Sequence, residues 1–379
     1  MDAQATARIP RPFLQMPDPR AANRRHKLID ILTIALFAVI CGADGWVAVV
    51  TYAKAKFAWL KSFLDLPHGI PSHDTFGELF ARLDPDAFER CFQEWMGSLV
   101  ELSGGKLVAI DGKSLRQSFE HAWDKSGMAH MVSAFVQANH MVFAQLKTEG
   151  KGQELSAIEK LLEILDLEGA VVTIDALGCQ KPIAQKILQA KANYLLQVKE
   201  NQPTLHQKLK LTLDDCILDG FAGQCSDHFE QTNGGHGRIE TRKLWVCWDV
   251  ELLGEVGREW PGLRSMLVLE SRRQIIGQEA SVERHYYISS LDGRSTAKRL
   301  AECVRGHWAV ENNLHWQLDI SFSEDERRIR KGHGAENFSR LCRIGLNLLK
   351  NEKTQKTGIA IKRQTCGWDN DYLLKVVFA

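Results

Sequence analysis

The sequence from Arg305 to Asp325 reads RGHWAVENNLHWQLDISFSED, and the rest of the chain is best interpreted outward from it. Apolar residues recur at near-helical spacing through this stretch and just before it: Leu300, Val304, Trp308, Leu314, Leu318 and Phe322. Ser295 can cap the helix that these residues would form. This spacing predicts one amphipathic α-helix over about residues 296–319. Its residues His307, Glu311, His315 and Asp319 recur every four positions, so we expect them on one polar stripe. Such a stripe is often only a solvated helix face, and alone it assigns no site.

Two aspartates end short apolar runs elsewhere in the chain. Asp111 follows Leu107–Ile110, and Asp175 follows Ala170–Ile174. Both runs are typical of buried strands. Open α/β sheets place their chemistry at the carboxyl ends of strands, so both carboxylates are candidate site residues. The alternative for each is an ordinary turn residue, which is a common role of Asp before glycine or alanine turns.

Three motifs together resemble the DDE transposases of bacterial insertion sequences, in particular the H-repeat-associated, Rhs-linked subgroup. They are Ala109-Ile-Asp111-Gly-Lys113, Thr173-Ile-Asp175-Ala176 and the run around Glu311. The resemblance covers nearly the whole chain, and it includes further short stretches: Asp18-Pro-Arg20, Pro71–Phe76, Val198–Gln202, His236–Arg242 and Cys366–Asp369. The run around Glu311 is the specific motif, because an Asp-Gly or Asp-Ala turn alone is common.

The resemblance implies an α/β fold with a ribonuclease H-like catalytic core, in which Asp111, Asp175 and Glu311 bind two Mg²⁺ or Mn²⁺ ions. These hard ions take oxygen ligands, and a pair of them can activate the attacking oxygen and stabilise the leaving oxygen of a phosphodiester. The implied reaction is hydrolysis at the element ends, followed by attack of the released 3′-hydroxyl on target DNA. The implied partners are double-stranded DNA, from the ends and the target, and further copies of the chain in a dimer or larger assembly.

Basic and polar residues near these motifs are candidate DNA contacts, with a surface or structural role as the alternative for each. They are Lys113, Lys199, Asn201, Gln202, His236, Arg238, Arg242, His307, His315, Arg327, Arg328, Arg330 and Lys331. The net charge is only +1, so overall basicity does not indicate DNA binding. Charge is concentrated at the ends instead: residues 1–27 carry six Lys and Arg against two Asp, and residues 339–363 carry seven against one Glu. Basic ends suit contacts with a phosphate backbone.

The pattern of elements predicts four regions. An all-helical N-terminal domain for DNA-end binding covers 1–104, and the first part of the core covers 105–200 with the order β-β-β-α-β-α-β. Compact domains rarely hold long structureless loops, so residues 201–294 are expected to form a folded, β-rich insertion. Residues 295–379 are expected to complete the core with the catalytic helix and a basic C-terminal helix.

Composition sets the broad class. The chain has 379 residues, of which 44% are hydrophobic and 25% charged, as in ordinary globular proteins. Its nine cysteines form no Cys-x-x-Cys motif, which favours reduced thiols and a cytoplasmic location. The apolar stretch Leu28–Ala43 is shorter than a membrane span and contains Asp30, so no membrane partner is expected.

Three alternatives remain open at this stage. Two share the fold: a nuclease or resolvase that only hydrolyses DNA, and a catalytically silent domesticated copy that binds DNA. The third is a glycosidase that uses a carboxylate pair, which would work without a metal ion.

Overall fold

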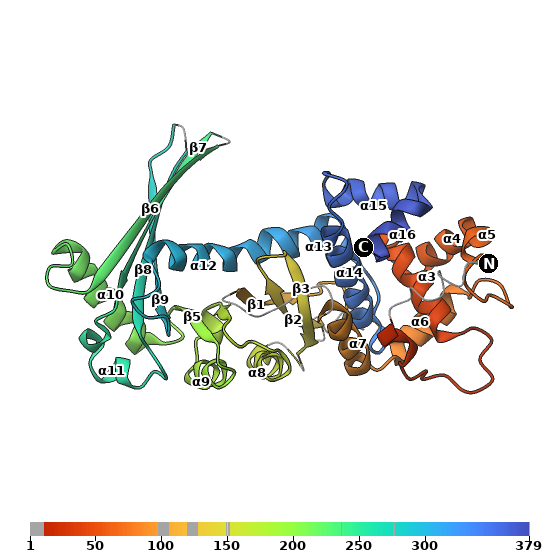
Figure 1. Ribbon diagram of the computed structural model, residues 1–379, viewed down its shortest axis with the longest axis horizontal. Coiled ribbons are helices and arrows are strands. Elements are labelled where there is room, and N and C mark those ends of the chain that lie inside the picture. Colours follow the sequence, from red (N-terminus) through yellow and green to blue (C-terminus); the bar gives the residue numbers. More distant parts are fainter. Residues whose placement is uncertain are drawn as a thin grey trace. The chain divides into compact units, whose positions relative to one another are not determined.

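The computed structural model describes residues 11–97, 106–119, 128–148, 150, 152–235, 237–275 and 277–378. The protein is mixed α/β, and its described strands form one nine-stranded sheet in the order β3-β2-β1-β4-β5-β9-β8-β7-β6 (Figure 1). The chain divides into two compact units. The helical unit comprises Met1–Glu101, Gly112–Ala157 and Glu311–Ala379, and the sheet unit comprises Leu102–Asp111 and Ile158–Val310. The boundaries of these two units differ from the boundaries of the four predicted regions.

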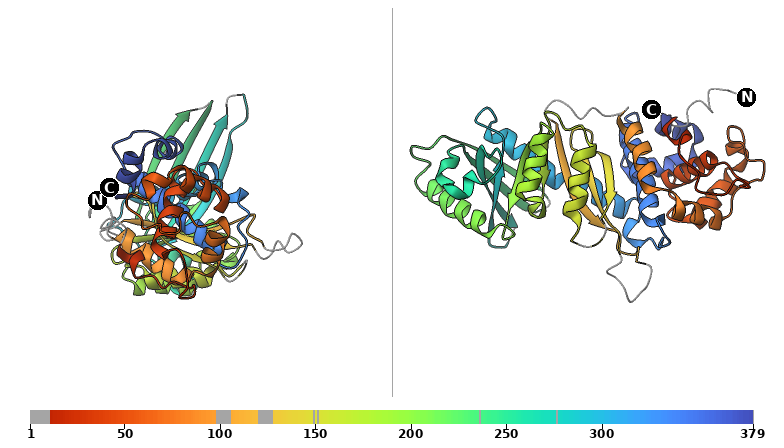
Figure 2. Two further views of the ribbon diagram at one scale, coloured as in Figure 1. Left: turned by 90° about the vertical axis from the view of Figure 1, so that its right-hand side faces the viewer. Right: turned by 90° about the horizontal axis from the view of Figure 1, so that it is seen from below.

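Three parallel strands form the centre of the sheet unit. They are β1 (Leu107–Ser114), β4 (Val171–Ile174) and β5 (Asn193–Val198), and β4 lies between the other two. All four residues of β4 are buried, as expected for a parallel strand covered on both faces. Helix α12 (Ala297–Val310) covers one face, and α9 (Lys181–Gln189) covers the other (Figures 1 and 2). The β-α-β order predicted for the last part of residues 105–200 is therefore confirmed.

The predicted insertion is folded and rich in strands. After α10 (Pro203–Leu218) come four antiparallel strands, and the last of them pairs with β5: β6 (Ser226–Gly235), β7 (Arg238–Cys247), β8 (Ser265–Ile275) and β9 (Ser281–Ser289). Two short helical turns, η3 (Val250–Leu253) and α11 (Glu255–Arg258), lie between β7 and β8. Strand β6 was not predicted, because Phe229 is the only large apolar residue in its ten positions.

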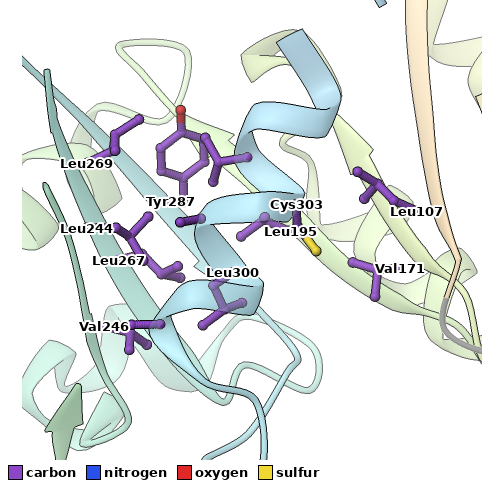
Figure 3. Close-up of a cluster of buried hydrophobic side chains, with 13 residues drawn as sticks. Leu107, Val171, Leu195, Leu244, Val246, Leu267, Leu269, Tyr287, Leu300 and Cys303 are labelled. Carbon is purple, nitrogen blue, oxygen red and sulfur yellow. The ribbon is translucent and has the colours of Figure 1, made fainter. Parts of the chain in front are cut away.

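One hydrophobic cluster joins the insertion to the parallel strands. Leu300, Cys303 and Val304 of α12 are buried in it. Facing them are side chains from both parts of the sheet, including Val171, Leu195, Leu244 and Leu267 (Figure 3). Burying side chains of this size stabilises the fold by roughly 1.5–3 kcal/mol each. The position of α12 is therefore determined by packing against both parts of the sheet.

The helical unit contains helices from both ends of the chain. Its N-terminal helices are α2 (Arg11–Leu14), α3 (Leu28–Ile40), α4 (Trp46–Ala55), α5 (Phe57–Leu60), α6 (His73–Arg82) and α7 (Pro85–Gly97). Its C-terminal helices are α13 (Trp316–Ile320), α14 (Gly334–Asn351), α15 (Ile359–Trp368) and α16 (Asn370–Phe378). Strands β2 (His130–Val136) and β3 (Met141–Lys147) pair as an antiparallel hairpin. Helix α8 (Glu154–Ile164) has residues in both units.

Helix α14 is the centre of the helical unit, and it is buried on its polar side as well as its apolar side. Its apolar residues, such as Phe338, Leu341 and Ile344, are buried, and so are Arg340 and Arg343, which are 1% and 0% exposed. Arg340 Nε donates to Glu89 Oε2 of α7 at 2.8 Å, and the other oxygen of that carboxylate accepts the Gln145 backbone N–H of β3 at 2.7 Å. Polar residues of α14 therefore connect α7 to the hairpin.

The predicted basic surface over residues 339–363 is wrong for four of its seven cations. Arg340, Arg343, Lys362 and Arg363 are buried and bind groups of the protein. Arg363 Nη2, for example, donates to the Val39 carbonyl at 2.7 Å, and its guanidinium lies 4.0 Å from the Phe322 ring centroid. The sequence pattern could not show this, because a buried helix with internal ion pairs has the same charges as a solvated one.

Among the described residues, no helix combines the length and apolar character that crossing a lipid bilayer would require.

The Glu89–Arg340 pair provides a test of this packing. Arg340→Met should lower the free energy of unfolding by about 3–5 kcal/mol, because it leaves a buried carboxylate without its cation. The double variant Glu89→Gln, Arg340→Met should recover much of that loss, because neither charge remains. Urea unfolding followed by circular dichroism measures both values. A loss below about 1 kcal/mol in the single variant would contradict the assigned role.

Asp30 of α3 gives a second test, through pH. It is 3% exposed, one of its oxygens has no hydrogen-bond partner among the described residues, and burial raises its pKa from 3.8 to about 6. Because the folded pKa lies above the unfolded one, the protonated form stabilises the fold, and stability falls as pH rises from about 4 to 6. At pH 7, Asp30→Asn should therefore raise the free energy of unfolding by roughly 1–3 kcal/mol. The gain should vanish near pH 4, and the exposed Asp44→Asn should show neither effect.

Candidate functional site

Asp111 and Asp175 each come directly after the last paired residues of β1 and β4, although β1 itself continues to Ser114, beyond the strand end at Ile110 that the sequence predicted. In the parallel pairing of β1 and β4, Ile110 is the partner of Ile174, and each aspartate is the next residue. Both carboxylates therefore emerge at the same level on adjacent strands, where parallel sheets carry their functional groups. Asp111 is half-buried and Asp175 is exposed.

The loop after Asp175 is held by side chains from beyond β5. Asp175 caps the short turn η2 (Ala176–Gly178), and its Oδ1 accepts the Leu177 N–H at 3.2 Å. Asn201 Nδ2 donates to the Ala176 carbonyl at 2.5 Å, and Gln202 Nε2 donates to the Cys179 carbonyl at 3.0 Å. These two predicted DNA contacts therefore bind the loop itself, which holds Asp175 in place.

His307 connects α12 to the strand that carries Asp175. Its Nδ1 lies 3.1 Å from Thr173 Oγ1, two residues before that aspartate. Burial lowers the pKa of His307, and the charge of Asp175 opposes this shift. This contact between His307 and Thr173 therefore helps to fix the position of α12 along β4.

Glu311 directly follows the last residue of α12 and begins a π-helical turn, Glu311–His315, before α13. The prediction of one continuous α-helix over 296–319 is wrong at this turn. A π turn contains one more residue than an α turn, which rotates the following positions by roughly 100°. Because of this rotation, the four-residue spacing does not place all of His307, Glu311, His315 and Asp319 on one face of the helix. Glu311 is exposed, and His315 is half-buried at the end of the turn.

Lys113 binds acidic residues within the helical unit. Its ammonium lies 2.6 Å from Asp319 Oδ1 and 3.2 Å from Asp325 Oδ1, and its side chain is 9% exposed. Arg116 reaches the other oxygen of Asp325 at 3.1 Å. Asp319, predicted to lie beside Glu311 on the stripe, is thus an ion-pair partner of Lys113.

Some of the remaining candidate DNA contacts bind other groups of the protein, and others are exposed. Arg330 donates to the Gln117 carbonyl at 3.2 Å and lies over Phe119; Arg327 donates to the Phe322 carbonyl, and Lys331 pairs with Glu78. Lys199 and Arg328 are exposed. His236 lies outside the described residues.

A polar hollow of about 260 Å³ lies in the insertion, on the sheet face that packs against α12. Strand residues two apart share a face, so the buried Leu244 and Leu269 are followed along that face by Arg242 and by Ser271 and Arg273. Trp308 of α12 and His285 of β9 also line the hollow, with their ring centroids 5.7 Å apart. Arg242 and Arg238 both pair with Glu240. The hollow thus combines cationic, acidic and aromatic groups.

The donor set at the strand ends suits a hard cation. In the described part of the chain, no three His, Cys, Asp or Glu side chains are grouped closely enough to hold one metal ion. Magnesium does not require such a group, because it is commonly bound by one or two carboxylates together with waters and substrate phosphates. Asp111 and Asp175, which follow paired residues of neighbouring strands, therefore have the chemistry and the backbone placement that this kind of site needs.

Comparison with known proteins gives consistent matches. The family model described as "Transposase DDE domain" matches residues 102–348, and the one described as "DDE_Tnp_1-associated" matches residues 11–96. The protein named "Putative transposase YncI" of Escherichia coli O157:H7 is 40% identical, over 96% of this chain and 92% of that protein. "H repeat-associated putative transposase YhhI" of E. coli K12 is 37% identical, over 96% of this chain and 95% of that protein.

The structure is also similar to a chain of a solved piggyBac transposase synaptic complex with hairpin DNA, and the match covers 99% of this chain and 78% of that chain. Its TM-score of 0.41 at 11% identity is too low for the likeness to bear on fold or function.

Gly178 offers a test of the Asp175 loop. A Cβ at this position would lie 2.9 Å from the Ile174 Cβ, so the turn or the end of β4 would have to shift. Gly178→Ala should lower the free energy of unfolding by about 1–3 kcal/mol. It should also speed amide exchange at Ala176 and Leu177. Gly234→Ala in β6, where an added Cβ meets nothing within 4 Å, is the matched control. Equal stability of the two variants would show that the loop is not tightly packed.

Proposed function

The chain belongs to the family of DDE transposases, and on this premise we propose that it cuts DNA at the ends of its own element and joins the released 3′-hydroxyl to target DNA. The observation that carries the proposal is the pairing of Ile110 with Ile174, which brings Asp111 and Asp175 to the same sheet edge. Glu311, the first residue after α12, is the third carboxylate of the proposed site. We assign this core to the ribonuclease H-like class.

Asp111, Asp175 and Glu311 would hold two Mg²⁺ or Mn²⁺ ions. When bound, these ions would activate the attacking oxygen and neutralise charge on the leaving oxygen. The protein's own residues position the carboxylates. Asn201 and Gln202 brace the loop of Asp175, and His307 holds α12 against β4.

The arginines of the polar hollow in the insertion support a role in DNA binding. Arg242, Arg272 and Arg273 line the hollow, and Arg238 is on β7, the strand that also carries Arg242. Cations on an extended sheet suit the regular charge of a phosphate backbone, and such contacts weaken as salt rises. We include Lys199 and Arg328 among the contacts, because both are exposed.

The proposal predicts separate effects on chemistry and binding. Asp111→Asn, Asp175→Asn and Glu311→Gln should each lower cleavage by at least about 100-fold, or roughly 3 kcal/mol in the barrier. Binding of the same DNA should change little, because each variant removes negative charge. The assay incubates each protein with Mn²⁺ and a labelled duplex that carries a terminal repeat flanking the gene. Glu302→Gln on α12 and Asp166→Asn after α8 are exposed controls and should cleave normally.

Three outcomes would contradict this function. Cleavage that survives a chelator would favour a metal-independent hydrolase. Hydrolysis without joining of pre-cut ends to a plasmid would favour a nuclease or resolvase. Specific end binding without any cleavage would favour a catalytically silent copy.

A further inference from the structure

Lys350 joins two parts of the helical unit through backbone carbonyls. It lies in the last turn of α14, and its ammonium donates to the His140 carbonyl at 2.7 Å and to the Asn313 carbonyl at 2.6 Å. His140 closes the turn between β2 and β3 with a φ of +55°, and Asn313 is the middle residue of the π turn. The ammonium also lies 5.3 Å from the centroid of the Phe135 ring.

No carboxylate of the described residues forms an ion pair with this ammonium. Burial, with a smaller contribution from the charge of Lys353, lowers the pKa of Lys350 to about 7. An apolar side chain of the same length would avoid the cost of burying a cation. Stability alone therefore does not explain a lysine at this position. Its two hydrogen bonds do, because they connect the turn at His140 to the π turn at Asn313.

The π turn is the segment that such bonds can stabilise. Its i→i+5 geometry is rare, and π turns occur often at functional sites. Leu314 is completely buried and anchors one side of the turn, while Glu311 is exposed at its first residue. The Asn313 carbonyl lies two residues after Glu311, so a bond to it restrains the backbone that directs the glutamate.

We propose that Lys350 is a positioning residue, which holds the π turn through the Asn313 carbonyl and so fixes the direction of the Glu311 side chain. This inference rests on the role of Glu311 in the proposed function. Lys350 acts through the backbone of the turn, using the hairpin turn at His140 as the fixed point on the other side.

Hydrogen exchange tests the structural part without any need for activity. Lys350→Met should speed amide exchange across residues 311–316 by about tenfold or more, while α14 and the hairpin keep their protection. Lys350→Arg, which keeps donors of similar reach, should restore most of it. Lys375→Met, in the last turn of α16 and exposed, is the matched control. Unchanged exchange at the turn, or an equal rise throughout the unit, would overturn the proposal. If Lys350→Met does not fold, Lys350→Gln carries the same test with a smaller expected rise.

Cleavage of the end duplex tests the functional part. Lys350→Met should lower kcat by about 10- to 100-fold with little change in KM for DNA, because the carboxylate is misdirected and DNA contacts remain. Lys350→Arg should regain most of the rate. If Glu311→Gln is inactive and Lys350→Met cleaves like the parent, the positioning role alone fails. If the parent does not cleave, the proposed function fails, and the exchange result still decides whether Lys350 holds the turn.

Discussion

The parallel register of β1 and β4 is the constraint on which the proposed site depends. Ile110 pairs with Ile174, and this pairing determines that Asp111 and Asp175 follow at the same level, where the contact between β1 and β4 ends. The register is held because both strands are buried between helices, so a slip of one residue would draw a charged residue at the end of a strand into the core. Leu300 and Val304 of α12 pack into the same core, and the chain then continues directly into Glu311. Two carboxylates thus follow from strand pairing, and the third is proposed from the helix that covers those strands.

The helical unit depends on a different interaction, the ion pairs of α14. Glu89 binds Arg340 and a backbone N–H of β3, while Glu324 binds Arg343 at 2.8 Å. Buried pairs of this kind contribute little to stability compared with apolar packing, but they tolerate few alternative arrangements because a lone buried charge is costly. Lys350 at the end of the same helix extends this pattern to the π turn. The N-terminal helices, the hairpin and the turn after α12 are thus all connected through α14.

Much of this architecture could be predicted from periodicity, because the strands of the core are short apolar runs and the helices between them have clear amphipathic spacing. Strand β6 was missed because its side chains are polar and it is defined by pairing with β7. The π turn was missed because four-residue spacing continues through it. The cations of α14 were assigned to a surface because only tertiary contacts distinguish a buried arginine from a solvated one. The structural roles of Asn201 and Gln202 were not predicted for the same reason, although their position just after β5 is where a brace for the neighbouring loop would lie.

The central claim is that Asp111 and Asp175 bind one divalent ion between adjacent strand ends. Anomalous diffraction at the manganese edge, from crystals grown with MnCl₂ and end DNA, tests it most directly. The account predicts a manganese peak about 2.0–2.6 Å from a carboxylate oxygen of each aspartate, with Glu311 as a ligand of that ion or of a second one. Manganese bound elsewhere, with neither aspartate as a ligand, would contradict it.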